Sequence, residues 1–506
     1  MRWVYSLSPE LEEGWDVLGG KAHGLVVLRR LGLPVPPGFV IGTEAGRAFL
    51  RHGRLPDGLD DELAAAVAEL EATTHRTLGG PERPLAVSVR SGGSVSMPGM
   101  MTTILNPGLT AEATAGLAAE AGDPRFARDS RQRLLASFAA STGGEPIPND
   151  AIGQLRLAVA AVFSSWDTPR AATYRELNGI PHDLGTAVTV QAMVFGNRDD
   201  HSGAGVAFSR NPNTGRRVPF GEVLFGRQGD DVVSGGSLTR PLHDLADREP
   251  AVWAGLLEAL RRVEEHHRDA CYLEFTFEAG QLWLLQARPG RFAGAAAVRV
   301  AVDLADEGVI GRHEALLRIS PRHLQLVRVP RIVAVDEADV LARGLGAVPG
   351  VAVGRVATTA DRAVRMATDG PVILVRPVTS PQDLPGLAAA AGVVTARGGS
   401  ASHAAVVARA MGKPAVVGAA GLAVDAAGAS VRAGGRAIPE GTAIAIDGTG
   451  GEVVMGAPRV AMTAADPHLQ RLLDWADEVA GGGTGRGDTE RLGAAHAVLR
   501  PGASIP

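Results

Sequence analysis

The alternation of apolar and polar residues changes character several times along the 506-residue chain. Up to about Pro107, short apolar runs such as Leu85 to Val89 predict buried strands between glycine-rich turns. From about 109 to 179, apolar residues recur at helical spacing and predict a helical insertion. Strand-like patterns then return in four segments: Ala187 to Phe195, Gly205 to Phe208, Tyr272 to Phe277, and Gln281 to Leu285.

The second half begins with helix and connector, from about Phe292 to Arg343. A compact β/α unit follows, with strands expected at residues 350–356, 372–375, 392–395 and 443–446. After Gly456 the pattern weakens. One helix is expected over residues 469–479, whereas the glycine-rich run 481–487 and the terminal residues 500–502 are expected to be loose. The length suggests about three domains.

Composition and charge narrow the possible functions. The net charge of −5 and the lack of a basic run argue against nucleic acid as the main partner. Cys271 is the only cysteine, so an intrachain disulfide is excluded, which fits a reducing compartment. The first residues do not form the apolar stretch of a signal peptide, and no apolar run could span a bilayer. The expected location is cytoplasmic, without membrane association.

The segment from Thr395 to Gly412 carries the strongest chemical signal. An apolar strand leads into two glycines and a serine, and an alanine-rich helix follows His403 and ends at Gly412. His403 is therefore expected at a helix N-terminus, where unpaired N–H groups and the helix dipole favour an anion. An imidazole there is well placed to carry a phosphoryl group. The alternative is a histidine that only caps a surface helix.

Two glycine-rich segments in the first third predict contacts to polyphosphate. Lys21 follows paired glycines at an expected helix start, from which its ammonium group can reach phosphate oxygens. Arg90 ends a buried strand, and the Met97 to Met101 segment after it forms a flap of glycine and methionine. Arginine suits bidentate phosphate contacts. A solvated lysine and an ordinary salt-bridge arginine are the structural alternatives.

Two neighbouring strand patterns form an expected hairpin with polar residues. By period-two alternation, Tyr272, Glu274 and Thr276 share one face of the first arm, and the second arm carries Gln286 and Arg288. Carboxylate and amide oxygens suit Mg²⁺, and the guanidinium suits the phosphates that the metal accompanies. The alternative is an exposed strand face with ordinary polar residues.

Together these segments resemble the pyruvate phosphate dikinase family, from about residue 15 to about 458. Besides the His403 segment, the matching stretches are residues 19–31, 88–105, 185–233, 274–288 and 379–383, the third of them including the run from Gly203 to Pro212. The resemblance implies an α/β and α+β multidomain protein. It comprises an ATP-grasp-like nucleotide-binding domain (1–295, helical insertion about 109–179), a helical linker (296–345), a swivelling β/α phosphohistidine domain (346–458), and a tail (459–506) that looks like the start of a barrel.

The same resemblance implies the reaction and the residues that perform it. His403 attacks the β-phosphorus of ATP and releases AMP, and inorganic phosphate then takes the terminal phosphoryl group. Glu274 and Gln286 would hold Mg²⁺. The residues implied in ATP or phosphate binding are Lys21, Arg90, Gly99, Met193, Val194, Glu222, Gln228 and Arg288, with Met193 and Val194 near the adenine. The final acceptor, a small molecule or a barrel-type protein supplied in trans, is left open.

The sequence also departs from the family pattern. The large barrel that binds pyruvate and phosphoenolpyruvate is not seen, so the pyruvate half-reaction is expected to need a partner or not to occur. Tyr272 stands where the family has a second acidic residue, which weakens the expected metal site. Thr102 replaces an aspartate after the flap, and Ala401 replaces a threonine beside His403.

Three functions therefore compete. The first is a phosphotransferase that charges His403 from ATP. The second is a dikinase that phosphorylates an antibiotic or metabolite, although no large substrate insertion separates the two domains. The third is a nucleotide-sensing or scaffolding remnant without chemistry, which Tyr272 favours and the intact set around His403 opposes.

Overall fold

The computed structural model describes residues 2–95, 97, 99–234, 239–290, 292, 294–333, 336–400, 402–462, 466–482 and 485–500. The chain divides into two compact units. Unit 1 comprises residues 1–204, 225–229 and 273–287, and unit 2 comprises residues 205–224, 230–272 and 288–506. Ala401 and Pro98 lie outside the described residues, so the departure noted at Ala401 has no structural account.

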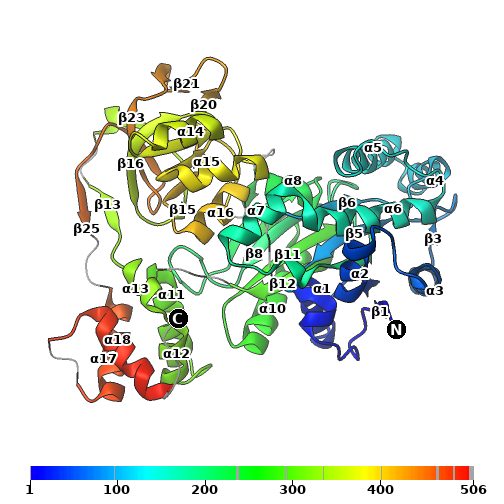
Figure 1. The fold of residues 1–506 in the computed structure, drawn as a ribbon, viewed down its shortest axis with the longest axis horizontal. Helices are drawn as coiled ribbons and strands as arrows, with labels where there is room; N and C mark the ends of the chain where they lie inside the picture. Colours follow the sequence, from blue (N-terminus) through cyan, green and yellow to red (C-terminus); the bar gives the residue numbers. More distant parts are fainter. Residues whose placement is uncertain are drawn as a thin grey trace. The chain divides into compact units, whose positions relative to one another are not determined.

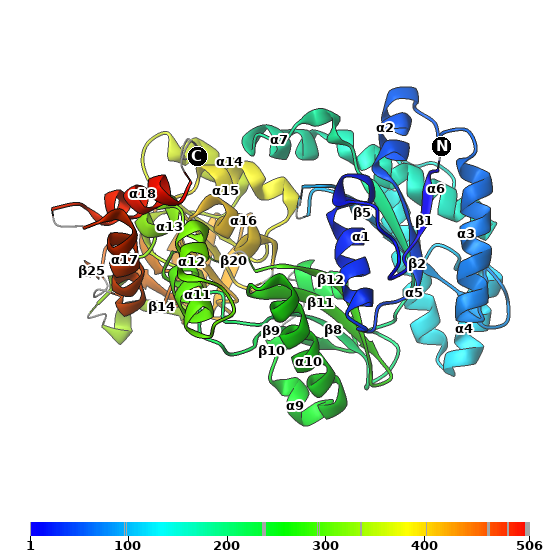
Figure 2. The ribbon, with the colours of Figure 1, turned by 90° about the horizontal axis from the view of Figure 1, so that it is seen from below.

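Unit 1 is built on a five-stranded antiparallel sheet. Its order is β1 (Val4–Ser6), β2 (Gly38–Ile41), β7 (Ala187–Ala192), β5 (Val87–Gly92) and β6 (Thr103–Leu105). The expected strands at 85–89 and 187–195 are thus present as β5 and β7, the latter ending at Ala192. Helix α1 (Trp15–Arg30) packs along β5, as Figure 2 shows.

Helices supply most of the remaining core of unit 1. The predicted insertion consists of α4 (Ala111–Ala121), α5 (Pro124–Ser141), α6 (Ala151–Ser164) and α7 (Pro169–Leu177). Leu134, Phe138, Leu155 and Val159 are all buried in one cluster with strand residues such as Val89, which confirms the helical spacing that predicted them. Two further helices are α2 (Thr43–His52) and α3 (Leu59–Thr74), and a short pair of strands is β3 (Thr77–Leu78) with β4 (Pro84–Leu85).

A second five-stranded sheet contains the predicted hairpin. Its order is β10 (Arg240–Pro241), β9 (Phe220–Phe225), β8 (Gly203–Phe208), β11 (Cys271–Glu278) and β12 (Gln281–Pro289). Residues 273–287 of the hairpin belong to unit 1, whereas Gly205–Phe208 and Phe220–Leu224 belong to unit 2. The helices between these strands are α8 (Gly229–Ser234), α9 (Asp244–Arg248) and α10 (Pro250–His267).

The β/α part of unit 2 is an eight-stranded mixed sheet. Its order is β14 (Val340–Arg343), β24 (Glu452–Met455), β23 (Ala443–Asp447), β16 (Val351–Ala357), β17 (Val372–Arg376), β18 (Gly392–Thr395), β19 (Ala415–Val417) and β15 (Leu345–Val348). Strands β16 to β19 run parallel. The crossover helices are α14 (Ala360–Ala367), α15 (Leu384–Ala389) and α16 (His403–Met411) (Figure 1). All four predicted strands are present within this sheet.

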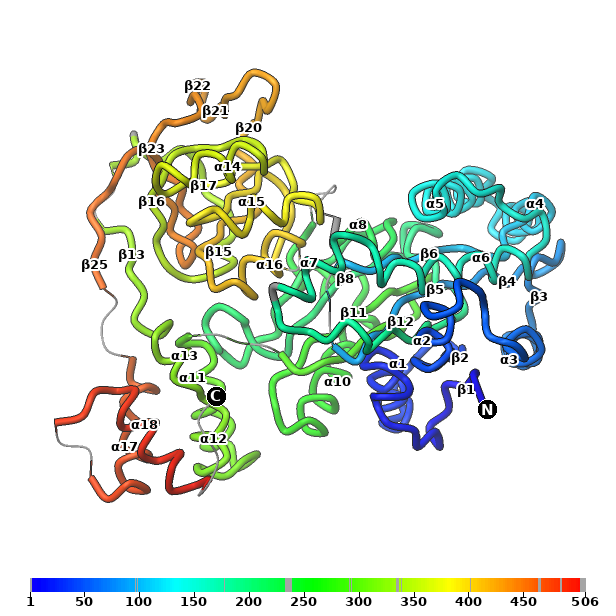
Figure 3. Tube along the Cα trace, viewed as in Figure 1, coloured from blue at the N-terminus to red at the C-terminus, as the bar shows by residue number. Residues whose placement is uncertain are grey.

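Two smaller sheets were not predicted. A three-stranded antiparallel sheet, β20 (Leu422–Asp425), β21 (Ser430–Ala433) and β22 (Arg436–Pro439), packs its apolar residues into the core of the large sheet. The other is a ribbon of β13 (Pro330–Ile332) and β25 (Val460–Met462), which pair antiparallel and are traced side by side in Figure 3. This ribbon joins the chain entering the β/α part to the chain leaving it.

The C-terminal region is more ordered than its sequence pattern predicted. Helices α17 (Pro467–Ala480) and α18 (Asp488–Leu499) pack with α11 (Gly294–Asp306), α12 (Arg312–Arg318) and α13 (Pro321–Gln325) around one buried apolar cluster. The helix predicted over 469–479 is confirmed, and α18 is an element that the weak pattern did not predict. The expectation of a loose end at 500–502 falls partly outside the described residues.

Among the described residues, every sheet is open and none closes into a barrel. No helix in the part of the chain that the structure describes is long and apolar enough to cross a membrane.

Candidate functional site

His403 is the first residue of α16, as the sequence predicted. Ser402 is the N-cap, and its hydroxyl accepts a hydrogen bond from the Ala405 N–H at 3.5 Å and donates one to the Gly399 carbonyl at 2.7 Å. The helix ends at Gly412 in the left-handed conformation, with φ of 64°. Because β18 ends at Thr395, the strand, glycine turn and helix follow one another at the carboxyl edge of the parallel strands. The local sequence thus determines where this imidazole lies.

The two ring nitrogens of His403 have different surroundings. Nδ1 lies 3.2 Å from the hydroxyl oxygen of Thr379, whereas Nε2 is buried and has no hydrogen-bond partner among the described residues. Thr379 follows β17, the parallel neighbour of β18, which brings it to the start of α16. If the ring carries its proton on Nδ1, it donates to Thr379 and leaves the lone pair of Nε2 free.

The electrostatic surroundings keep this imidazole neutral. Burial lowers the pKa of His403 to about 4, and the negative charge of Asp383 opposes that shift. Asp383 itself is buried and accepts hydrogen bonds from the N–H and hydroxyl of Ser380. Only a neutral imidazole has a nucleophilic lone pair, so the site favours the reactive form across the physiological pH range.

An NMR titration tests this electrostatic account. We expect the His403 ring signals, assigned by their loss in His403→Asn, to titrate near pH 4 instead of near the ordinary value of 6.5. Between these values the unfolded chain binds a proton on this residue that the folded protein does not bind. The His403 contribution therefore lowers stability as the pH falls from 6.5 toward 4. A His403 midpoint above 6 contradicts this interpretation.

The predicted phosphate-binding residues Lys21 and Arg90 lie at neighbouring points of unit 1. Helix α1 consists of two helical segments that meet at a kink at Gly19 (φ of 73°), so Lys21 lies in the first turn of the second segment, as the sequence predicted. A Cβ on Gly19 would lie 1.6 Å from the Gly92 carbonyl oxygen, which explains why the approach of α1 to β5 needs glycine there. Lys21 Cβ lies beside Gly92, two residues after Arg90 on the same strand.

Arg90 connects the sheet of unit 1 with the hairpin. Its guanidinium lies 3.2 Å from the Glu274 carboxylate and donates to the Leu285 carbonyl at 2.9 Å. Both side chains are largely buried, with 12% of Arg90 and 27% of Glu274 exposed. The arginine and the carboxylate that the sequence predicted for phosphate and metal are therefore in contact.

Gln286 belongs to the same hairpin. A two-residue turn with positive φ at Ala279 and Gly280 joins β11 to β12. Burial alternates along β12 until Leu285 and Gln286, which are both half-buried. Gln286 is thus half-buried on β12, as Glu274 is on β11.

These residues fit a magnesium ion that arrives with a nucleotide. Mg²⁺ is typically held by one or two carboxylates with substrate phosphates and water, and not by a complete protein cage. The described residues contain no cluster of three or more His, Cys, Asp or Glu side chains that could hold a metal. Glu274 and Gln286 offer two hard oxygen ligands, and Arg90 offers a cation for the phosphates.

The residues predicted near the adenine and the flap also lie in unit 1. Met193 directly follows β7, and its N–H donates to the Ala86 carbonyl at 2.9 Å, while Val194 is buried. Gln228 is buried and accepts from the Gly196 N–H at 3.3 Å. Gly99 is exposed with φ of 71°, next to the fully buried Met100. Thr102, which replaces an aspartate, donates its N–H to the Ser165 hydroxyl at 3.1 Å.

Arg288 and Glu222 belong to unit 2 instead. The Arg288 guanidinium lies 4.3 Å from the ring centre of Tyr272, and that ring meets Phe208 edge to face at 4.9 Å. Tyr272 is thus a buried platform for a cation. Glu222 is 7% exposed on β9, and its carboxylate accepts the Ser400 N–H of the loop before His403. Sequence reasoning did not anticipate this contact, nor the contact of Thr379 with His403.

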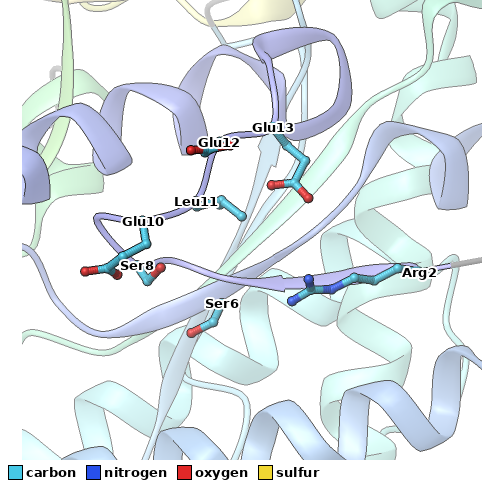
Figure 4. Close-up of a pocket in the computed structure, with 7 residues that line it drawn as sticks. All are labelled: Arg2, Ser6, Ser8, Glu10, Leu11, Glu12 and Glu13. Atoms are coloured by element: carbon cyan, nitrogen blue, oxygen red, sulfur yellow. The ribbon is translucent and has the colours of Figure 1, made fainter.

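An open hollow in unit 1 lies elsewhere. Its volume is about 560 Å³, and Figure 4 shows its lining at the N-terminal loop: Arg2, Ser6, Ser8, Glu10, Leu11, Glu12 and Glu13. None of the predicted site residues contributes to it, and its three glutamates make it unsuited to a polyphosphate.

Comparison with known proteins identifies the two functional parts. Residues 50–241 match the family described as the pyruvate phosphate dikinase AMP/ATP-binding domain, and residues 368–451 match the mobile domain of PEP-utilising enzymes. The first class of domain handles the nucleotide and the second contains His403.

Through these two domains the chain is similar to the pyruvate phosphate dikinases. It is 41% identical over 513 residues to pyruvate, phosphate dikinase 2 of Oryza sativa subsp. japonica, covering 92% of this chain and 58% of that protein. It is 39% identical over 540 residues to pyruvate, phosphate dikinase of Rhizobium meliloti (strain 1021), covering 94% of this chain and 60% of that protein. The chain thus spans about three fifths of the length of these relatives.

Proposed function

We propose that this protein is an ATP-dependent phosphotransferase in which His403 receives a phosphoryl group from ATP, with release of AMP, and passes it to an acceptor. The observation that carries the proposal is the state of His403. It is a neutral imidazole at a helix N-terminus, with Nδ1 in contact with Thr379 and Nε2 without a partner among the described residues. A histidine nucleophile needs an unprotonated ring nitrogen, and a partner on the other nitrogen fixes the tautomer.

The reaction can be written with its bonds balanced. The Nε2 lone pair attacks the β-phosphorus, the bond from that phosphorus to the oxygen bridging it to the α-phosphate breaks, and AMP leaves. An oxygen of inorganic phosphate then attacks the terminal phosphorus of the pyrophosphoryl-histidine. The bond from that phosphorus to the oxygen bridging it to the β-phosphorus breaks, so pyrophosphate forms and phosphohistidine is the leaving group. His403 keeps the original β-phosphoryl group. The dipole of α16 stabilises the dianion that remains on the ring.

Unit 1 supplies the groups proposed to bind ATP. Lys21 and Arg90 would neutralise phosphate oxygens, and Met193 and Val194 would contact the adenine, with Gly99 and Gln228 completing the pocket. Glu274 and Gln286 would hold Mg²⁺, which supplies charge neutralisation for the polyphosphate when bound. Arg288, supported by the Tyr272 ring, would assist with the phosphates from unit 2. Glu222, the remaining residue of the predicted set, is a buried carboxylate that would repel phosphate, so we assign it no phosphate contact.

Two labelled substrates test the proposed half-reactions. With γ-labelled ATP and magnesium, label should accumulate on the protein without phosphate and move into pyrophosphate when phosphate is added. With β-labelled ATP, label should stay on the protein through the same chase. Release of γ-label as inorganic phosphate, with or without added phosphate, would identify water as the co-substrate instead.

The transfer also requires His403 to move between the nucleotide and the acceptor. The helical linker predicted over residues 296–345 is where the sequence places the swivel. The packing of this linker suggests a shorter segment for the pivot. Helices α11 to α13 belong to the buried helical cluster, whereas Arg331 and the Ile332 N–H bind the buried Asp447 carboxylate at 2.8 and 2.9 Å. Arg328 forms an ion pair with Asp488 of α18 at 3.3 Å. We therefore propose that the chain pivots between Arg328 and Pro330, in the segment that leads into the β/α part of unit 2.

Tyr272→Asp tests the interpretation of the metal site. The substitution restores a carboxylate two positions before Glu274 and should lower the magnesium concentration needed for labelling of His403 severalfold. It also removes the aromatic platform under Arg288 and the contact with Phe208, so thermal stability should fall. Labelling is measured across a magnesium titration.

Tyr272→Phe is the matched control, because it keeps the ring and adds no charge. It should leave both magnesium dependence and stability close to those of the unmodified chain. An unchanged magnesium dependence in a folded Tyr272→Asp protein would contradict the view that this position limits the metal site.

A nucleotide-binding protein without chemistry is the second candidate function, and Tyr272 is the observation that favours it. Magnesium-dependent ATP binding without label on His403, in both the unmodified chain and Tyr272→Asp, would establish that function. The acceptor is proposed only by class: a small molecule, of which an antibiotic-type substrate is one version, or a barrel-type protein in trans.

A further inference from the structure

The loop before His403 is held at Ser400 by two charged side chains, and one of them, Glu222, is distant in the sequence. The buried Glu222 carboxylate accepts the Ser400 N–H, although the two residues are 178 positions apart. On the other side, the Arg409 guanidinium lies 3.5 Å from the Ser400 carbonyl and 3.0 Å from the Ala347 carbonyl. We call Glu222, Ser400 and Arg409 the Ser400 clamp.

The contact between Glu222 and the loop is so close that a side chain at residue 399 would displace the carboxylate. A Cβ on Gly399 would lie 1.8 Å from each of the two carboxylate oxygens of Glu222. No side chain can be placed there without moving the carboxylate or the loop. The Gly-Gly-Ser sequence before His403 therefore has a second purpose besides its turn, because it allows the carboxylate to reach the backbone.

Charge in the clamp is balanced within a buried environment. Burial raises the pKa of Glu222, and the Ser400 N–H and the positive charge of Arg409 oppose that shift. Burial likewise lowers the pKa of Arg409 to about 10, and the positive charge of Arg288 adds to that effect, while Tyr272 and Glu222 oppose it. Glu222 and Arg409 thus stabilise each other's charged form at the loop.

The clamp acts on His403 through two short links. The Gly399 carbonyl accepts from both the N–H and the hydroxyl of Ser402, at 3.1 and 2.7 Å, and Ser402 caps the helix that His403 begins. Displacement of Ser400 therefore changes the N-cap and with it the position of the imidazole. The hydrogen-bond partner of the ring among the described residues is Thr379, and not Glu222 or Arg409. The role of Glu222 and Arg409 is therefore to position the loop.

We propose that Glu222 is a positioning residue whose hold on the His403 loop depends on phosphorylation: it binds Ser400 while His403 is unmodified and releases it when His403 carries phosphate. The phosphoryl group brings close to two negative charges to a residue three positions from Ser400. Like charges repel strongly where water is partly excluded, whereas the attraction to Arg409 increases. This inference rests on the proposed function, because it assumes that His403 is the phosphorylated residue.

Amide hydrogen exchange of the peptide containing Ser400 tests the proposal in the full chain. His403 is phosphorylated chemically with phosphoramidate, which transfers its phosphoryl group to imidazole nitrogen and releases ammonia, so that ATP is not needed. The unmodified protein should protect the Ser400 amide, and phosphorylation should accelerate its exchange by about tenfold or more. His403→Asn, treated identically, should show no acceleration.

Three variants separate charge from packing. Glu222→Gln keeps the size and the acceptor oxygen but removes the charge, so its protection should be similar before and after phosphorylation. Glu222→Ala should lose the protection in both states; if it does not fold, Glu222→Gln alone decides. Glu258→Gln, an exposed carboxylate on α10, is the matched control and should behave like the unmodified chain.

The proposal is overturned if phosphorylation leaves exchange at Ser400 unchanged, or if Glu222→Gln responds as strongly as the unmodified protein. A failure of ATP to label His403 would instead overturn the proposed function. Because phosphoramidate bypasses ATP, the two failures are distinguishable.

Discussion

His403→Asn is expected to reduce labelling of the protein by β-labelled ATP at least about a thousandfold, because no other group in the site replaces the nucleophile. Asparagine keeps a polar side chain beside Thr379, so the start of α16 should remain intact. Binding of ATP should be nearly unchanged, because the proposed nucleotide ligands are on other elements. The measurement is acid-labile label per protein, with nucleotide affinity determined in parallel.

The control for this substitution is His52→Asn, at an exposed residue at the end of α2, which should be labelled normally. Label retained by His403→Asn would show that another residue carries the phosphoryl group. Simultaneous loss of labelling and nucleotide binding would show that His403 supports the fold and is not primarily the nucleophile.

The second large effect concerns stability. Arg210→Met is expected to destabilise unit 2 by about 3–5 kcal/mol, the usual cost of removing one partner from a buried ion pair. Arg210 is fully buried and binds Glu264 at 2.8 Å and Glu307 at 2.7 Å. Burial alone lowers the pKa of Arg210, but the hydrogen bonds to the two carboxylates outweigh that effect and raise it. Without the guanidinium, both carboxylates lose their shared partner in a region of low solvent access.

Denaturant unfolding of the full chain measures this effect as a shift in the transition. Arg261→Met is the matched control, because Arg261 also pairs with two glutamates, Glu258 and Glu265, but is 51% exposed. Its loss should cost much less than the loss of Arg210, because solvent screens exposed ion pairs. Equal shifts in the two variants would contradict the importance assigned to the buried ion-pair network.

The features that the sequence predicted best are local ones. The position of His403 follows from Gly398, Gly399, the Ser402 cap and the Gly412 terminus, all within one short segment. The hairpin with Glu274 follows from period-two alternation and the Ala279–Gly280 turn. Such signals depend on backbone geometry close in sequence, and the structure contains both elements.

Contacts between distant segments could not be predicted in this way. Thr379 reaches His403 only because β17 and β18 are parallel neighbours, and Glu222 reaches Ser400 across 178 positions. The kink at Gly19 also has a distant cause, because β5 approaches α1 closely there. The packing of α17 and α18 depends on apolar residues in α11 to α13, which no local pattern reveals.

The central claim is that ATP charges His403. Its most direct test is to incubate the unmodified chain with β-labelled ATP and magnesium, without phosphate, and to measure acid-labile label on the protein together with AMP. If ATP charges His403, the label should be located on His403 and AMP should form in equal amount. ATP bound without label or AMP, in a protein shown to be folded, would contradict it.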